Sequence, residues 1–506
     1  MFGFPRPDLV SKHLLIDESD GAPGHDVLYH LNESILEDHV LKRLLRHFAF
    51  TCIFLCAVGA GDTVLASRKE PRHIEKGISA YPSRVENSQP ELQRLDTGEP
   101  SGVITLGQAL ALAIMKNPGL AAYSWEVRAA EARILQASLL PNPEFDFEAE
   151  ELGWSDGRNG IGSAVMYFVF SQMLELGDKR GKRTSVAELE TDIEDWEYAS
   201  KRLDLLAETT KAFIKALAAR KKVASSEKFH QLAKRVFQVV SERVEAGKVS
   251  PLEETKAQVT IAGTRIELER ARRQWDVTRK RLAATWGSIS PNFEGVAGDL
   301  EKVSGLPSLD QLLRQTAQNP DQARWETEIL LREAKLEFEK SKRIPNVTVS
   351  AGLQRFEQTN DNAFVFALSI PLPIFDRNQG GIEEARHNIR KVEEEKKVAD
   401  VRIKTELNGV YQILSASYLE AMALKKDVLP AAKRVFDGLS EGYRQGKFRY
   451  LDVLDAQRTL FDAQAKYIEA LANYHEASVE VQRLIGQRVD EARVAKDKGG
   501  EISEKK

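Results

Sequence analysis

The sequence predicts a mainly α-helical protein with a smaller β portion, arranged as two similar halves. The pentapeptide AKRVF stands at residues 233–237 and again at 432–436, and the residues that follow each copy align without a gap. Long segments of helical periodicity carry almost no proline, whereas four shorter segments alternate apolar and polar residues. A self-similarity that fills most of a chain indicates a duplicated architecture, so the two halves are expected to fold alike.

The composition favours long helices over a compact mixed fold. Charged residues make up 29% and aromatic residues 8% of the 506 positions, a balance that is typical of long helices. This length fits either about two to four ordinary domains or one elongated structure. The net charge is −4 and basic residues are interspersed with acidic ones, so we expect no nucleic-acid partner.

One strongly apolar run, residues 48–60, follows a basic segment near the start of the chain. The run is too short to span a bilayer comfortably, and a basic segment before an apolar one is typical of a secretory signal. We therefore interpret residues 41–66 as a signal peptide, with cleavage after Ala60 or Ala66; an uncleaved membrane anchor is the alternative. Residues 1–40 are interpreted as a non-native or unstructured extension, as a mis-assigned start would produce.

Both cysteines of the chain, Cys52 and Cys56, lie inside this apolar run. The exported chain would therefore have no cysteine, and neither a disulfide framework nor a thiol site is expected. Residues 67–103 are polar, rich in proline and without periodicity, which predicts a flexible lead-in. Order is expected to begin near Thr105, a residue suited to cap a helix. Residues 488–506 are interpreted as a disordered charged tail.

The remaining chain divides into a first repeat, residues 104–300, and a second repeat, residues 301–487. An Asn-Pro pair at residue 117 and another at residue 319 start corresponding segments, and each half is predicted to hold a helix, two strands and two long helices. Period-two segments of roughly ten residues joined by polar turns are what a transmembrane barrel requires. A soluble hairpin that lies on helices would have the same pattern, so both remain open. The four strand segments are residues 144–152, 162–174, 346–356 and 362–372.

The predicted helices are unusually long. No proline interrupts residues 180–246, and residues 382–445 contain only Pro430, so each segment could reach roughly 100 Å at about 1.5 Å per residue. The shorter helices at 251–287 and 320–343 are together nearly as long and are expected to stack end to end beside a long one. Apolar residues of the last helix form two stripes with coiled-coil spacing, which predicts two neighbouring helices. This pattern favours a curved wall of helices, although a buried helix in a bundle would carry the same two stripes.

The repeated pentapeptide lies on the last turns of two long helices. The segments that follow it, residues 246–251 and 445–450, each carry a glycine that ends a helix before the next one begins. AKRVF is therefore expected to lead into two equivalent helical hairpin tips.

An enzymatic function finds little support in the sequence. The histidines after the signal segment are widely spaced and form no cluster with metal-ligand spacing. No phosphate-binding loop, nucleotide fingerprint or nucleophile motif occurs. We therefore expect no enzyme, no metal centre and no cofactor. These histidines are His73, His230, His387 and His475.

Several motifs together resemble a known family of channels. They are NPGL at 117–120, LLPNP at 139–143, LELGDKRGKR at 174–183, PLPIFDRNQG at 371–380 and the stretch around Gly446. Residues 103–487 resemble the outer-membrane factors of tripartite efflux systems, the TolC superfamily. The fourth motif and LELGDKRGKR resemble most the CzcC-type branch, which serves cobalt-zinc-cadmium resistance.

The resemblance implies a TolC-like trimeric α/β-barrel in the outer membrane of a Gram-negative bacterium. Each protomer of the homotrimer would give four strands to a twelve-stranded barrel in outer-membrane lipid and its helices to a periplasmic tunnel. Four strands cannot close a barrel in lipid alone, where open edges are intolerable, and this agrees with a shared barrel.

The implied function is a passive exit duct for heavy-metal cations of the cobalt, zinc and cadmium type. The duct would work with a periplasmic adaptor protein and a proton-driven inner-membrane pump of the RND type. The alternatives are a TolC-like duct for drugs or for type I protein secretion, and a non-channel periplasmic coiled-coil scaffold.

The resemblance also assigns roles to the hairpin tips. In the family the tips meet the adaptor, which carries over to Gly247, Lys248, Gly446 and Lys447. Glycine is also a common helix terminator, and this structural role is compatible with the contact.

Asp452 and Asp455 match the position at which acidic rings line the family's tunnel mouth. Residues three apart share a helix face, and threefold symmetry would focus a negative potential that favours cations. Two solvated acids near a helix N-terminus are the alternative. The first repeat has Glu253 and Lys256 at the corresponding positions, so the two tips differ in charge.

Overall fold

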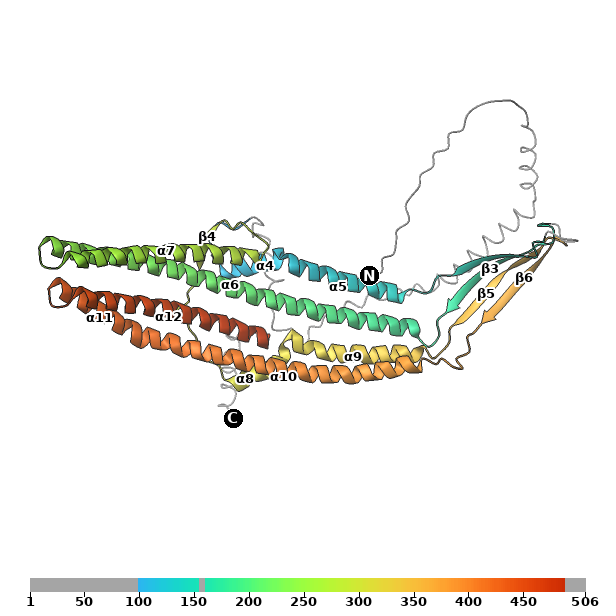
Figure 1. The fold of residues 1–506 in the computed structure, drawn as a ribbon. Coiled ribbons are helices and arrows are strands. Elements are labelled where there is room, and N and C mark those ends of the chain that lie inside the picture. The colour runs from blue at the N-terminus through green and yellow to red at the C-terminus, as the bar shows by residue number, and fades with distance from the viewer. Residues whose placement is uncertain (1–98, 154–159, 487–506) are drawn as a thin grey trace, which may run out of the picture. The chain divides into compact units, whose positions relative to one another are not determined.

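The structure, a computed structural model, describes residues 99–153 and 160–486 (Figure 1). These residues all belong to one compact unit of the chain, Lys76–Lys506. The predicted signal peptide, the extension before it, most of the lead-in and the charged tail lie outside the described residues. The division of the rest into repeats at residues 300 and 301 stays a prediction.

The first series of elements begins with a short strand and ends with a long helical hairpin. Asn117 starts the second helix by accepting a hydrogen bond from the Leu120 amide at 2.8 Å, and Pro118 occupies the first helical position, where a missing amide hydrogen costs nothing. The elements are β1 (Gly102–Thr105), α4 (Leu106–Lys116), α5 (Pro118–Ser138), β2 (Glu144–Glu150), β3 (Val165–Leu174), α6 (Lys179–Glu245) and α7 (Pro251–Ala284).

The second series repeats this order. Asn319 caps its helix as Asn117 does, by accepting a hydrogen bond from the Asp321 amide at 2.8 Å, so the repeated Asn-Pro pair starts equivalent helices. The elements are β4 (Phe293–Ala297), α8 (Leu309–Gln315), α9 (Pro320–Ser341), β5 (Val347–Phe356), β6 (Asp361–Ser369), α10 (Gln379–Ala423), α11 (Leu429–Arg444) and α12 (Tyr450–Ile485), with a 3₁₀ turn at Thr316–Gln318.

Two features differ from the sequence-based expectation. The helix predicted over 382–445 contains a π-helical turn, Leu424–Val428, between α10 and α11, because Pro430 lacks an amide hydrogen and its ring crowds the preceding turn. Strand β1 starts at Gly102, inside the range predicted as lead-in, since it pairs in parallel with β4. Residues that pair across nearly 200 positions leave no local pattern.

The long helices lie side by side (Figure 1). Helix α6 packs on α5 and α7 and also on α9 and α12, while α10 packs on α9 and α12, and α11 packs on α12. Helix α12 thus has neighbours on two sides, as its two apolar stripes predicted. The expected end-to-end pairing of 251–287 with 320–343 is wrong: α7 and α5 share one side of α6, and α9 and α12 share the other.

The strands form one antiparallel sheet in the order β2-β3-β5-β6. Its register places Phe145 opposite Phe170, and Phe170 opposite Ala351, which pairs with Phe366. One face therefore carries a row of apolar side chains, and Phe366 is 78% exposed in one chain. The opposite face carries carboxylates at alternate positions of β2, namely Glu144, Asp146, Glu148 and Glu150.

Among the described helices, none has the length and apolar character needed to cross a membrane.

A network of ion pairs joins three of the long helices. The Arg483 guanidinium of α12 contacts Asp204 of α6 at 3.4 Å, Glu406 of α10 at 2.9 Å and Glu480 of its own helix at 2.5 Å. Lys211 of α6 also binds Glu480. Burial disfavours the charged carboxylate, yet hydrogen bonds from Lys211 and Arg483 outweigh it and lower the pKa of Glu480.

We expect Arg483→Met to lower the free energy of unfolding by about 2 kcal/mol, because partly buried carboxylates lose their shared partner. The side chain of Arg483 is 20% exposed. Arg386→Met is the matched control, since Arg386 pairs with Glu383 within α10 at 58% exposure, and such surface pairs contribute little. Denaturant unfolding of the purified protein measures both variants, and equal losses would contradict a special role of the network.

Candidate functional site

The two hairpin tips have the same backbone geometry. Gly247 and Gly446 adopt left-handed conformations, with φ of 64° and 79°. The Lys248 amide donates to the Arg243 carbonyl at 2.9 Å, and the Lys447 amide donates to the Gly442 carbonyl at 2.8 Å. This is the Schellman arrangement, which favours glycine at the left-handed position. The four predicted adaptor contacts thus lie exposed at two equivalent turns.

Asp452 and Asp455 lie one turn apart at the start of α12. The Asp452 carboxylate accepts a hydrogen bond from the Arg449 amide at 3.1 Å and pairs with the Arg449 guanidinium at 3.4 Å. Part of its role is therefore local, as an acid that satisfies a free amide at a helix start. Asp455 is exposed. Their role as a gate stays a prediction.

Three other residues link the two hairpins at this level. The Arg243 guanidinium of α6 lies 4.8 Å from the centroid of the Tyr443 ring and donates to the Tyr443 carbonyl. The Tyr443 hydroxyl donates to the Glu253 carboxylate of α7 at 2.9 Å. We call Arg243, Glu253 and Tyr443 the tip link. It ties both helices of the first hairpin to α11 of the second.

Tyr443 is the buried member of the tip link, whereas Arg243 and Glu253 are partly exposed. Tyr443 is 2% exposed, and burial, followed by the hydrogen bond to Glu253, raises the pKa of its hydroxyl far above its usual value. The tyrosine therefore stays a neutral donor across the physiological pH range. An apolar cluster lies beneath it, and the rings of Tyr443 and Tyr450 are 6.0 Å apart. The cluster includes Val240, Ala257, Phe436, Val453 and Ala456.

Sequence reasoning did not identify the tip link. The repeat aligns Arg243 with Gly442 and Val244 with Tyr443, so two members stand where the halves differ. The sequence did carry a signal for the tip link, namely the positions beside the tips at which the two halves differ. A contact between the halves needs residues that only one half carries. From the sequence, Glu253 was compared with Asp452 only for its charge. The structure shows that Glu253 accepts a hydrogen bond from Tyr443.

The described ranges contain no group of three or more His, Cys, Asp or Glu residues placed to hold a metal ion. The charges at the tips are instead distributed as single acids and bases along helix ends. Such an arrangement can attract or repel ions and can hold two helices together, but it offers no nucleophile paired with a base.

Comparison with known proteins agrees with this geometry. The family described as "Outer membrane efflux protein" matches residues 109–288 and 312–487. The chain is 35% identical over 389 residues to the cobalt-zinc-cadmium resistance protein CzcC of Cupriavidus metallidurans, covering 77% of this chain and 91% of that protein. It is 29% identical to the nickel-cobalt-cadmium resistance protein NccC of Alcaligenes xylosoxydans xylosoxydans, covering 56% of this chain and 64% of that protein.

A solved structure shows the same fold. The open state of the MtrE outer membrane channel of Neisseria gonorrhoeae superposes with a TM-score of 0.63 at 17% identity, covering 76% of this chain and 89% of that chain. The TolC-like fold predicted from the sequence is thereby confirmed. The family consists of efflux channels and not of enzymes. The chain belongs to the outer membrane efflux proteins, in the CzcC-type branch of the TolC superfamily.

Proposed function

We propose that this outer-membrane protein is a homotrimeric exit duct that passes heavy-metal cations of the cobalt, zinc and cadmium type. It would act with a periplasmic adaptor protein, met by Gly247, Lys248, Gly446 and Lys447, and with a proton-driven RND pump of the inner membrane. The similarity to CzcC supports the cargo. A passive duct has no energy source of its own, so the pump must supply the driving force.

The polar face of the sheet is the observation that carries this proposal. Its carboxylates occupy every second position of β2, from Glu144 to Glu150, while the opposite face carries the phenylalanine row. If three copies close a barrel with the apolar face toward lipid, the carboxylates line the lumen. A lumen of one charge sign concentrates cations and repels anions.

Asp452 and Asp455 are proposed to add a second negative ring at the periplasmic mouth. Asp455 is the more exposed of the two, because Asp452 is partly engaged by Arg449. The choice of metal cations over drugs or secreted proteins as the cargo rests on the similarity to CzcC, because the resemblance places acidic rings at the tunnel mouth of the family as a whole.

The charge of both zones can be tested by single-channel recording. We expect Asp452→Asn with Asp455→Asn to reduce the cation-to-anion permeability ratio several-fold in planar bilayers, because asparagine keeps the oxygen that accepts from Arg449 but removes the charge. The exchange Asp146→Asn with Glu148→Gln should act in the same direction on the lumen.

Asp310→Asn is the matched control for this experiment, because Asp310 is an exposed acid in the first turn of α8, away from both zones. A purified protein that never conducts would contradict the proposal that the protein is a duct. Conduction with an unchanged permeability ratio in both acid variants would leave the duct standing and overturn the cation cargo.

A further inference from the structure

The connection between β6 and α10 is longer and more apolar than its counterpart in the first half of the chain. Residues 370–378 join β6 to α10, whereas only residues 175–178 join β3 to α6. The longer connection begins Ile-Pro-Leu-Pro-Ile-Phe and carries no charged side chain before Asp376. We call residues 370–377 the β6–α10 connector.

The apolar side chains of the connector are exposed. Leu372 is 74% exposed, Ile374 is 60% exposed and Phe375 is 90% exposed. A contiguous apolar surface of this kind is usually covered by lipid or by another protein. The connector therefore needs an occupant from outside the described chain.

The connector continues the apolar row of β6. Phe364, Phe366 and Leu368 share the face of the phenylalanine row, and Ile370 and Leu372 follow at the same spacing of two. From Phe364 to Leu368 the row is about 13 Å long at about 3.3 Å per residue, and an extended chain to Leu372 makes it about 26 Å. The apolar band of an outer-membrane barrel is about 25 Å tall and its strands are tilted, so β6 alone covers less than half of the band.

The connector has few free backbone donors. Pro371 and Pro373 carry no amide hydrogen, and the Ile374 amide donates to the Leu372 carbonyl at 2.8 Å. A lone extended segment exposes amide hydrogens along both edges, and two of these are absent here because proline occupies alternate positions.

The next three carbonyl oxygens accept hydrogen bonds from side chains at the end of the connector. The bonds run from Arg377 Nε to Pro373 at 3.2 Å, from Arg377 Nη2 to Ile374 at 3.3 Å, and from Gln379 Nε2 to Phe375 at 3.2 Å. Water would satisfy these carbonyls in an ordinary surface loop. In lipid an unpaired backbone group is costly, so local bonds of this kind suit a segment that borders hydrocarbon.

We propose that the β6–α10 connector is embedded in the inner leaflet of the outer membrane. Leu372, Ile374 and Phe375 would lie among the acyl chains of phospholipids, and Arg377 would lie at the level of their phosphates, as long basic side chains do at a membrane boundary. This placement rests on the proposed function, in which the phenylalanine face of the sheet meets lipid.

A second copy of the chain covers the connector less well. In a closed barrel the neighbouring copy places β2 beside β6 in the same wall, so it borders the edge of the connector and leaves the outward face free. The segment before β2 carries Pro141 and Pro143, and prolines on both sides remove amide hydrogens that strand pairing needs. Pairing between the copies should therefore end at the connector, and lipid remains as its occupant.

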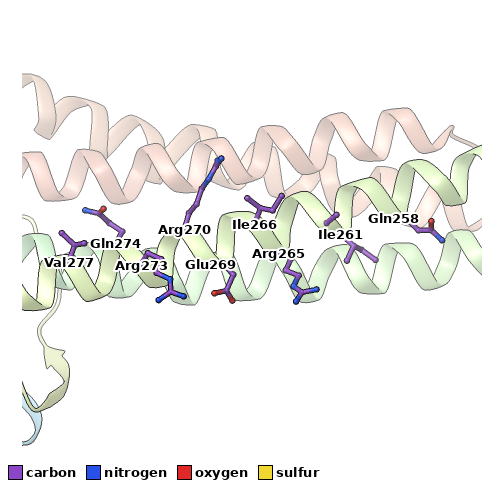
Figure 2. Close-up of a pocket in the computed structure, with 10 residues that line it drawn as sticks. Gln258, Ile261, Arg265, Ile266, Glu269, Arg270, Arg273, Gln274 and Val277 are labelled. Atoms are coloured by element: carbon purple, nitrogen blue, oxygen red, sulfur yellow. The ribbon is translucent and has the colours of Figure 1, made fainter.

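The exposed apolar row of α7 has a different character. Ile261, Ile266 and Val277 lie on a face that also carries charged side chains (Figure 2). Charged groups on a lipid-facing surface are destabilising, so this face suits contact with water or protein. Ile266 is 54% exposed and provides a matched control for Ile374. The charged residues are Arg265, Glu269, Arg270 and Arg273.

Fluorescence quenching in vesicles of phosphatidylethanolamine and phosphatidylglycerol tests the placement. A bimane fluorophore is attached to the full chain through Leu372→Cys, Ile374→Cys or Ile266→Cys, with alanine in place of Cys52 and Cys56. We expect a phospholipid with a nitroxide near the head of its acyl chain to quench both connector labels several-fold more strongly than the label on α7.

Two outcomes of this experiment would overturn the proposal. Aqueous iodide that quenches the connector labels while the lipid nitroxide does not would place the connector in water. Protection of these labels from both quenchers would place the connector against protein, such as a second copy of the chain.

The hydrogen bonds of Arg377 can be tested with the same label. Arg377→Met leaves the carbonyls of Pro373 and Ile374 without their partner, so we expect iodide quenching of the Ile374→Cys label to rise several-fold as the connector moves toward water. Arg386→Met, which removes an exposed arginine of α10, should leave the quenching as it was. Equal quenching in the two variants would contradict the role of Arg377.

Failure of the connector and failure of the duct are distinguishable, because the same preparations can be recorded in planar bilayers. A conducting protein whose connector labels are not reached by lipid refutes the connector alone. A protein that never conducts refutes the duct.

Discussion

Tyr443→Phe combined with Glu253→Gln is expected to raise the open probability of the channel, and with it the time-averaged conductance, several-fold. The Tyr443 hydroxyl donates to the Glu253 carboxylate at 2.9 Å across the two hairpins. Removing a hydrogen bond to a charged group shifts an equilibrium by about 1.5 to 3 kcal/mol, which is roughly a ten- to hundredfold change. If the tips open by separating the hairpins, the open state should become more populated.

The double exchange leaves most of the local packing in place. Phenylalanine keeps the ring that stacks under Arg243 and beside Tyr450, and glutamine keeps the shape of the glutamate. The effect should therefore appear in conductance and open probability, with little change in the unfolding transition.

Tyr418→Phe is the matched control, because it also removes a tyrosine hydroxyl and keeps the ring. Tyr418 lies on α10, and its ring centroid is 6.1 Å from that of Tyr474. Its conductance should equal that of the unmodified protein. An unchanged conductance in the Tyr443 and Glu253 variant would mean that the tip link only stabilises the closed hairpins locally and does not limit opening.

The second large effect is expected at Gly352, in the middle of β5. This residue pairs with Val169 of β3, and a β-carbon there would lie 2.3 Å from the Phe168 carbonyl oxygen and 2.8 Å from the Val169 α-carbon. Both atoms belong to the backbone, so no rotamer change can relieve the clash. We expect Gly352→Val to destabilise the pairing of the central strands by about 3 kcal/mol or more.

Loss of this pairing should prevent assembly in the membrane. The measurement is the amount of oligomer recovered by chemical crosslinking from the outer-membrane fraction, which should fall to a small part of the unmodified level. Ala351→Val is the control, since Ala351 is exposed on the opposite face and valine suits a strand. Normal assembly of the Gly352→Val protein would show that the two strands separate enough to admit a side chain.

Features that depend on neighbouring residues could be predicted from the sequence. Asn117 and Asn319 cap their helices within three residues, and Gly247 and Gly446 end theirs through bonds to the preceding turn. Alternation within each strand segment predicted a sheet with one apolar face, and the register bears this out. The duplicated order of these elements could also be predicted, because the residues that indicate each helix or strand lie within that helix or strand or directly beside it.

The sequence by itself thus determined the long helices, the four strands of the antiparallel sheet, their duplication and, with the family resemblance, the class of channel. Only the tertiary structure decided which helices share a side of α6, that β1 pairs with β4, and that Arg243, Glu253 and Tyr443 meet. The last pairing joins residues 190 positions apart. Such contacts depend on how whole helices pack against one another. The type of a residue does not reveal whether its side chain is exposed or buried, or which residue it contacts.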